Sequence, residues 1–170
     1  MVLKIVEYPN PSLKKNAAKV KRGDIPNLPR FIGDMVETMI EAHGIGLAAP
    51  QLGVARRLLV ADIDGEQRAF LNPRVVHGSG NIVDEEGCLS FPGLYGMVAR
   101  YEKVTVAYQD ASFRAHTEEF DGLNARVLQH EIDHINGVLL IDRAEDHYLY
   151  EKVFALEEEG TQAATRVREL

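Results

Sequence analysis

The feature that most constrains this chain is a pair of histidines, His130 and His134, placed four residues apart in a largely apolar stretch. Apolar residues recur at helical spacing across residues 122–136, and Gly137 follows them as a helix terminator. Because apolar side chains occupy much of its circumference, this predicted helix should be buried. Its apolar positions include Leu123, Val127, Leu128, Ile132 and Ile135.

The histidines belong to an HExxH motif, His130-Glu131-Ile132-Asp133-His134. Since roughly 3.6 residues make a helical turn, residues four apart return almost to one face, and both imidazoles can bind one metal ion. Glu131 lies about 100° round the helix from His130 and would flank that ion as a base. For a motif standing alone, the alternative is a buried helix whose histidines bond backbone carbonyls.

Two histidines are one short of the three protein ligands that catalytic metal sites usually have. A downstream third ligand is available in Glu145 or His147, but the extended HExxHxxGxxH pattern is absent, because Gly137 fits it and Leu140 does not. The other candidate is Cys88, the only cysteine, in the glycine-flanked segment Glu-Gly-Cys-Leu-Ser. A thiolate there would be stabilised by the cation, whereas an isolated cysteine is more often a small buried hydrophobe.

A third unusual segment, residues 44–51, has the sequence Gly-Ile-Gly-Leu-Ala-Ala-Pro-Gln. Its two glycines and two alanines favour a backbone packed closely against a neighbouring group, and Gln51 supplies a neutral donor at its end. Taken alone, the segment could equally be a helix cap at Gly44 followed by a solvated turn.

The rest of the chain predicts an α+β fold. Helical spacing of apolar residues over 25–43 predicts an amphipathic helix, and a second, charged helix is expected over 145–159. Short strands that follow one another without intervening helices favour antiparallel pairing. The β-branched and aromatic stretches that predict strands are residues 56–63, 69–76, 102–110 and 116–120.

Composition indicates one globular domain spanning residues 1–170, with 45% hydrophobic and 26% charged residues. The formal net charge of -7 argues against a body held to nucleic acid by phosphate neutralisation. No apolar run approaches the roughly 20 residues of a membrane span, and Pro9 and Pro11 interrupt the N-terminal segment before a signal-like core develops. We therefore expect a cytoplasmic protein with no membrane partner.

Together, the three segments resemble the peptide deformylases, whose signature motifs are GΦGΦAAxQ, EGCΦS and QHExDH, where Φ is apolar. Residues 44–51, 86–90 and 129–134 fit these motifs in the same order and at similar separations. The resemblance implies antiparallel strands around a central helix that carries the HExxH motif, with helices toward both ends. It also implies metal-dependent removal of the formyl group from the N-terminal formylmethionine of newly made proteins.

Residue by residue, the resemblance implies a metal held by Cys88, His130 and His134. Glu131 would be the general acid/base, and the oxyanion hole would come from Gln51 with the Leu89 backbone N–H. The family commonly uses one Fe(II) ion, and Zn, Ni or Co can also occupy the site, a choice that the donor set leaves open.

The resemblance also implies a substrate and its binding mode. The N-formylmethionyl peptide should lie extended against backbone groups of Ile45, Gly46 and Gly87, in the manner of an added strand. Val127, one helical turn before His130, is expected to line the methionine pocket. Another metal-dependent amidase or peptidase on the same scaffold remains the alternative.

Some members of the family dock on the ribosome through a basic C-terminal helix. Here residues 145–170 hold six Glu and one Asp, and their basic side chains are Lys152, Arg166 and Arg168. Any ribosome contact is therefore expected to be transient and not to use that route.

Overall fold

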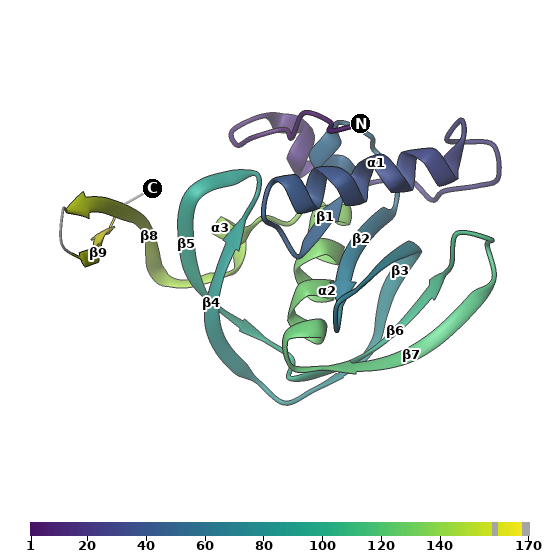
Figure 1. The fold of residues 1–170 in the computed structure, drawn as a ribbon. Coiled ribbons are helices and arrows are strands. Elements are labelled where there is room, and N and C mark those ends of the chain that lie inside the picture. The colour runs from purple at the N-terminus through teal and green to yellow at the C-terminus, as the bar shows by residue number, and fades with distance from the viewer. Residues whose placement is uncertain (158–159, 168–170) are drawn as a thin grey trace.

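The computed structural model describes the backbone of residues 1–157 and 160–167 and the side chains of residues 1–144. It is a mixed fold in which two antiparallel sheets and a few helices pack together (Figure 1). Two short 3-10 helices, η1 (Pro11–Lys14) and η2 (Ala49–Leu52), lie in the N-terminal part of the chain. Within the described residues, no helix is long and apolar enough to cross a membrane.

The larger sheet has five strands in the order β1-β2-β3-β6-β7, and each neighbouring pair is antiparallel. Its strands are β1 (Gly46–Ala48), β2 (Leu58–Ile63), β3 (Glu66–Ser79), β6 (Lys103–Gln109) and β7 (Ala115–Asp121). Buried residues alternate with more exposed ones in β6, which leaves one face of that strand for the core, and β7 adds the buried Phe120. The short strand β1 lies at one edge of this sheet, so its outer backbone groups have no strand beside them.

The smaller sheet has four strands in the order β4-β5-β8-β9, also antiparallel throughout. Its strands are β4 (Ile82–Cys88), β5 (Phe91–Arg100), β8 (Ala144–Glu157) and β9 (Gly160–Val167). β4 is an edge strand, and its register with β5 shifts between Gly87 and Cys88. Such an irregularity re-aims the side chains that follow it, which here include Cys88.

Two helices complete the core. α1 (Leu28–Glu41) is capped by the Asn27 side chain and packs Met35 and Met39 against β1 and β2. α2 (Gly122–Ile135) lies between the two sheets in Figure 1 and contacts all five strands of the larger one. Its side chains are buried without interruption from Ala125 to Ile135. A single-turn helix, α3 (Leu140–Arg143), follows it.

The positive φ of Gly137 explains where α2 ends. At φ 73° this residue occupies the left-handed region, and its N–H donates to the His134 carbonyl. A Cβ at this position would also lie 2.5 Å from the Lys14 carbonyl oxygen. Glycine is therefore required both for the helix end and for the approach of the N-terminal segment.

Most elements expected from the sequence are present. The helix expected over 25–43 is α1, that expected over 122–136 is α2, and the four expected strands correspond to β2, β3, β6 and β7. The helix expected over 145–159 is wrong: residues 144–157 form β8, and residues 158–159 lie outside the described part. Pairing with β5 and β9 decides the conformation here, because backbone partners outweigh a weak helical periodicity.

Candidate active site

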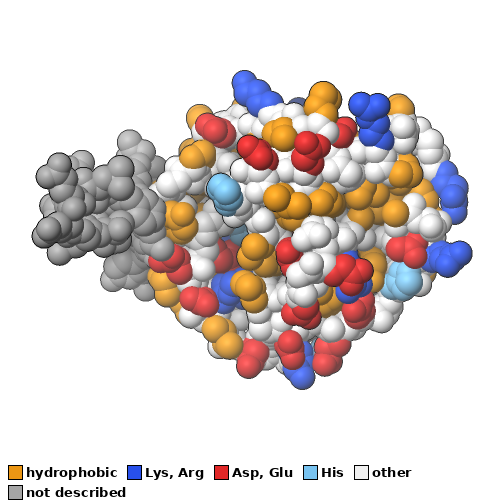
Figure 2. Space-filling view, in the orientation of Figure 1, with side chains coloured by type: hydrophobic (Ala, Val, Ile, Leu, Met, Phe, Trp, Pro, Cys, Tyr) orange, Lys and Arg blue, Asp and Glu red, His pale blue; other side chains and the backbone are white. Residues whose placement is uncertain are grey.

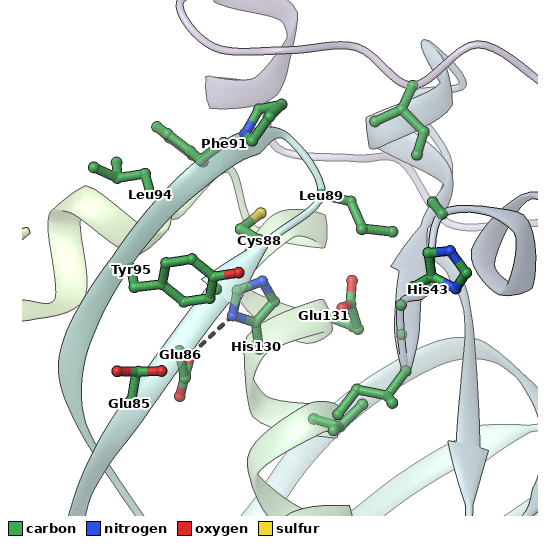
Figure 3. A pocket seen from close by; sticks show the side chains of 18 of the residues that line it. His43, Glu85, Glu86, Cys88, Leu89, Phe91, Leu94, Tyr95, His130 and Glu131 are labelled. Carbon is green, nitrogen blue, oxygen red and sulfur yellow. Dashed lines mark hydrogen bonds and ion pairs between the residues drawn. The ribbon is translucent and has the colours of Figure 1, made fainter. Parts of the chain in front are cut away.

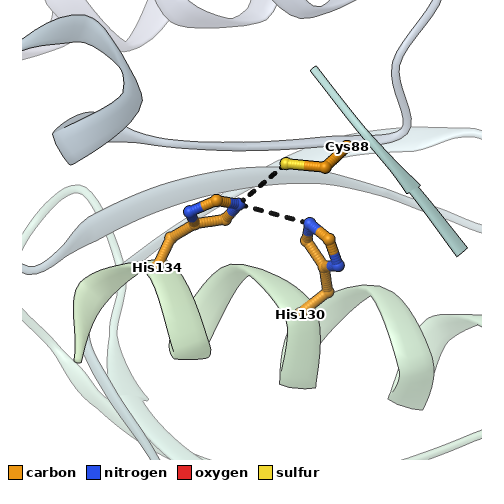
Figure 4. A group of neighbouring side chains, drawn as sticks. All are labelled: Cys88, His130 and His134. Atoms are coloured by element: carbon orange, nitrogen blue, oxygen red, sulfur yellow. Dashed lines mark hydrogen bonds between the residues drawn. The ribbon is translucent and has the colours of Figure 1, made fainter. Parts of the chain in front are cut away.

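Three potential metal ligands converge between α2 and the end of β4: two buried side chains come from α2 and one comes from β4. Consecutive turns of α2 present His130 and His134 on one face, and β4 delivers Cys88 to them (Figure 4). The Cys88 Sγ lies 3.2 Å from the His134 Nε2, which lies 3.3 Å from the His130 Nε2. One ligand atom from each residue falls within 4.8 Å of the others.

This cluster fits a cation. A thiolate and two imidazoles form a donor set that suits Fe, Zn, Ni or Co and leaves a coordination position for water. Burial lowers the pKa of His130, but the neighbouring Cys88 and Glu86 raise it well above its usual value, so the site favours a positive charge there. Burial, with the charge on His130, holds the pKa of His134 well below its usual value, so its ring is neutral and can donate a lone pair to a cation.

Glu86 fixes the orientation of the His130 ring. Its Oε1 lies 2.8 Å from the His130 Nδ1, so this nitrogen carries the proton. The Nε2 of the same ring then faces His134 with its lone pair. The same carboxylate accepts two hydrogen bonds of 2.9 Å from Arg100 and one of 2.6 Å from Arg126. Burial acts to raise the pKa of Glu86, but Arg100 and His130 outweigh it and keep the group ionised.

The ion-pair network extends beyond Glu86 to the other side of α2. The Arg100 Nη1 also donates to Asp133 at 2.5 Å, and Asp133 accepts two hydrogen bonds from Arg143. Arg126 additionally donates to the carbonyls of Val98 and Ile82, which ties α2 to β5 and β4. Sequence reasoning gave these residues no role, because their partners lie in distant segments of the chain.

Glu131 lies beside the cluster and points into the cavity in Figure 3. It is 4% exposed, and its Oε2 has no hydrogen-bond partner among the described residues. Burial raises the pKa of Glu131 to about 7 in the metal-free protein. A buried carboxylate with an unused oxygen and a pKa in this range can take up and release a proton near neutral pH.

Gln51 lies behind Cys88 and is almost fully buried. Its Oε1 accepts from the Ala48 N–H, whereas its Nε2 donates to Ser90 Oγ at 3.1 Å and points at Cys88 Sγ at 3.8 Å. The structure therefore places this expected oxyanion donor against the thiol, and Gln51 does not line the cavity itself. Ser90, which orients the amide, carried no signal in the sequence beyond its place in the motif.

A cavity of about 660 Å³ opens in front of these groups. Glu131, the Leu89 turn and the β5 side chains Leu94 and Tyr95 surround it in Figure 3. The space-filling view in Figure 2 shows hydrophobic side chains gathered across this face with acidic side chains around them. The sequence-predicted residues that line the cavity are Ile45, Gly46, Gly87, Cys88, Leu89, Val127, His130 and Glu131.

The two glycines of residues 44–46 allow the close packing expected of that segment. A Cβ on Gly46 would lie 2.6 Å from the Glu131 Oε1, and one on Gly44 would lie 2.7 Å from the Leu89 Cδ1. Both values are below the separation that real Cβ atoms show. The segment therefore brings its backbone directly against the Glu131 carboxylate and against the turn that follows Cys88.

Comparison with known proteins agrees with this geometry. Residues 2–148 match the model of the family described as polypeptide deformylase. The chain belongs to the polypeptide deformylase family. A peptide deformylase of Chlorobaculum parvum is 47% identical over 152 residues, covering 85% of this chain and 81% of the relative. One of Chromobacterium violaceum is 47% identical over 145 residues, covering 84% and 86% respectively.

Solved structures support the same conclusion. The peptide deformylase of Thermotoga maritima superimposes with a TM-score of 0.82 at 40% identity, covering 85% of this chain and 99% of the other. That of Legionella pneumophila gives a TM-score of 0.81 at 45% identity, covering 86% and 88%. The resemblance inferred from the three motifs is confirmed, and the chain is an enzyme of a metal-dependent hydrolase family.

Proposed function

We propose that this enzyme hydrolyses the N-formyl group from the N-terminal formylmethionine of newly made proteins and releases formate. The observation that carries the proposal is the convergence of Cys88, His130 and His134 next to the cavity that Glu131 lines, with the Glu131 Oε2 unpaired among the described residues. A closed structural metal site needs neither an adjacent base nor a substrate-sized cavity. Membership of the deformylase family selects this hydrolysis among metal-dependent amide cleavages.

We propose Cys88, His130 and His134 as the ligands of one divalent ion, with Fe(II) as the first candidate and Zn, Ni or Co as alternatives. When bound, such an ion lowers the pKa of its water toward ~7 and polarises the formyl carbonyl. The HExxH helix is the scaffold of the site, because α2 supplies two ligands and Glu131 from one buried element.

Different residues of the chain then transfer the proton and stabilise the developing negative charge. Glu131 accepts the proton of the attacking water and later passes it to the leaving amine. The Leu89 backbone N–H and the Gln51 amide are the proposed donors to the developing oxyanion. Since the Gln51 Nε2 lies against Cys88 and Ser90, its contribution requires one of its protons to turn from the sulfur toward the cavity.

The peptide is proposed to bind as an added strand between two sheet edges. β1 is an edge strand of the larger sheet, and β4 is an edge strand of the smaller sheet. Backbone groups of Ile45, Gly46 and Gly87 therefore face the cavity from both sides. Val127 lines the same cavity beside Leu94 and is the proposed wall of the methionine pocket. The formyl carbon bears only hydrogen, so a tight site can exclude acetyl and longer groups.

The wider setting follows from this substrate class. We propose that residues 1–170 act as one catalytic domain in the cytoplasm, where formylated nascent chains occur. A transient contact with the ribosome is compatible with this role, whereas specific binding of nucleic acid and of membranes is not part of it.

Turnover of formyl-Met-Ala against acetyl-Met-Ala by anaerobically purified protein, with metal analysis of the same sample, tests the proposal. We expect formate release from the first peptide and negligible cleavage of the second. Equal cleavage of both would favour the alternative, a broader metal-dependent amidase. A metal-loaded protein that cleaved neither would contradict both.

A further inference from the structure

A second cavity, of about 580 Å³, here called the rear cavity, lies along a different face of α2 from the active site. Its α2 side is formed by Gln129, Ile132, Asp133 and Asn136, which recur at helical spacing along one face. β3 and the end of β5 enclose it on either side. It shares no lining residue with the active-site cavity, so the two are separate spaces divided by the helix.

The charge of this rear cavity is opposite to that of the whole chain. Four arginines line it, namely Arg57, Arg74, Arg100 and Arg143, whereas Asp133 is its single carboxylate. The chain as a whole has a formal net charge of -7. A concentration of guanidinium groups in a concave site of an acidic protein is an arrangement that favours an anionic ligand.

Two of the arginines have partners already. Arg100 pairs with Glu86 and Asp133 beneath the cavity, and Arg143 pairs with Asp133 at its wall. The carboxylates within reach are therefore shared between these two guanidinium groups. The other two positive charges of the cavity belong to Arg57 and Arg74.

Arg57 has hydrogen-bond acceptors but no counter-charge among the described residues. Its Nη1 donates to Asn16 Oδ1 and Asn136 Oδ1 at 3.3 and 3.0 Å, and its Nη2 donates to the Pro73 carbonyl at 3.4 Å. Partial burial lowers the pKa of Arg57. These neutral contacts hold the guanidinium in place while leaving its charge uncompensated.

Arg74 is exposed, and within the described part of the chain it forms no ion pair or side-chain hydrogen bond. It lies on β3, which pairs with β2 next to Arg57. One guanidinium held by neutral groups and one without a partner thus line the same cavity. The planar fork of an arginine matches phosphate oxygens in a bidentate manner.

We propose that the cavity behind α2 is a binding site for a small phosphate-bearing ligand, held by Arg57 and Arg74 with Arg143 at the rim. A free phosphate compound and the backbone of an RNA strand share this chemistry. The small ligand is favoured because the cavity is a single pocket and the acidic remainder of the surface would repel a polyanion. This site is additional to the proposed deformylation and does not depend on it.

The test compares two variants that remove one positive charge each. Arg74→Gln alters the cavity at an exposed residue. Arg30→Gln is the matched control, because Arg30 is an exposed arginine on α1 that lies outside the cavity and whose side chain forms no hydrogen bond or ion pair with the described residues. Arg57→Gln is avoided because it would also remove three structural hydrogen bonds. Binding of inorganic phosphate to the metal-loaded enzyme is measured by calorimetry at constant ionic strength.

We expect the unaltered enzyme and Arg30→Gln to bind phosphate equally, and Arg74→Gln to bind it about tenfold more weakly, as the loss of a charged hydrogen bond implies. If the phosphate were bound at the metal instead, its affinity would be the same in all three proteins, and that result would overturn the proposal. Absence of binding by the unaltered enzyme, or equal weakening in both variants, would overturn the proposal. Tighter binding of a short single-stranded RNA that Arg74→Gln abolishes would replace the small ligand by nucleic acid and also overturn it.

Discussion

Glu131 and Glu86 lie near the same metal ligands and have opposite environments. Glu131 is buried with one oxygen unpaired, and burial raises its pKa to about 7. Glu86 accepts hydrogen bonds from two arginines and faces His130, so it stays ionised. One carboxylate is thus suited to exchanging a proton and the other to holding a ligand ring in place.

Replacing Glu131 by Gln tests the first of these roles. The amide keeps the shape of the side chain but cannot accept a proton from water, so kcat should fall ~10²–10⁴-fold. Metal content should stay at the level of the unaltered enzyme, because Glu131 is not among the three clustered ligands. Metal analysis beside formate release checks both points. A loss below tenfold with full metal occupancy would remove Glu131 from the proton-transfer role.

Replacing Glu86 by Gln tests the second role. The amide can still accept from the His130 Nδ1, but it no longer neutralises Arg100 and Arg126, which are both within 3 Å of the carboxylate. Loss of such an outer partner typically weakens metal binding ~10–100-fold. Competition with a chelator measures this directly. Unchanged affinity with reduced turnover would show that Glu86 acts on the substrate and not through His130.

At the scale of elements, the site depends on β1 approaching α2 more closely than a side chain allows. A Cβ on Gly46 would lie 2.6 Å from Glu131 Oε1 and 2.8 Å from its Cγ. Gly46→Ala should therefore displace Glu131 and lower kcat by an order of magnitude or more, while the metal ligands remain in place.

Gly33→Ala is the control for that substitution. Gly33 lies within α1, and a Cβ there meets nothing within 4 Å. Alanine in a helix interior is favoured over glycine by roughly 0.5–1 kcal/mol, so this variant should keep full activity and melt slightly higher. If both variants kept full activity, the close approach of Gly46 to Glu131 would have no catalytic meaning.

The sequence predicts best those elements whose characteristic pattern lies within one segment of the chain. The apolar spacing within residues 122–136 predicts α2 to within a residue of its end, because the pattern and the terminating Gly137 lie in one segment. β4 carries Asp84, Glu85 and Glu86 in succession and gave no strand signal. Its pairing with β5 is supported by the Glu86–Arg100 ion pair, which joins residues 14 apart.

The candidate site shows the same division. Cys88, His130 and Glu131 were predictable because each stands in a short motif whose chemistry is recognisable. Arg126 contacts Glu86 from 40 residues away, and the four arginines of the rear cavity come from separate segments. Such groupings depend on the tertiary fold, and the spacing of residues along the chain does not predict them.

At the scale of the whole molecule, the site is where the two sheets meet α2. The smaller sheet contributes Cys88, the helix contributes His130 and His134, and the edge of the larger sheet contributes the backbone around Gly46. A metal bound by Cys88 and the two histidines would therefore join β4 to α2, which the chain alone holds together by packing and hydrogen bonds. Its binding free energy would add to the free energy of unfolding only when β4 and α2 are assembled.

Removing the metal should consequently lower the melting temperature of the whole enzyme. A ligand present at a thousand times its Kd stabilises the native state by about 4 kcal/mol, which for a chain of this size corresponds to a shift on the order of 10 °C. Differential scanning calorimetry before and after anaerobic chelation measures the shift, and adding metal back should restore it. In Cys88→Ser the hydroxyl is a much weaker ligand for these metals, so the restored shift should be small or absent. A full shift in Cys88→Ser would place the metal elsewhere, whereas no shift in the unaltered enzyme would mean that binding does not hold β4 and α2 together.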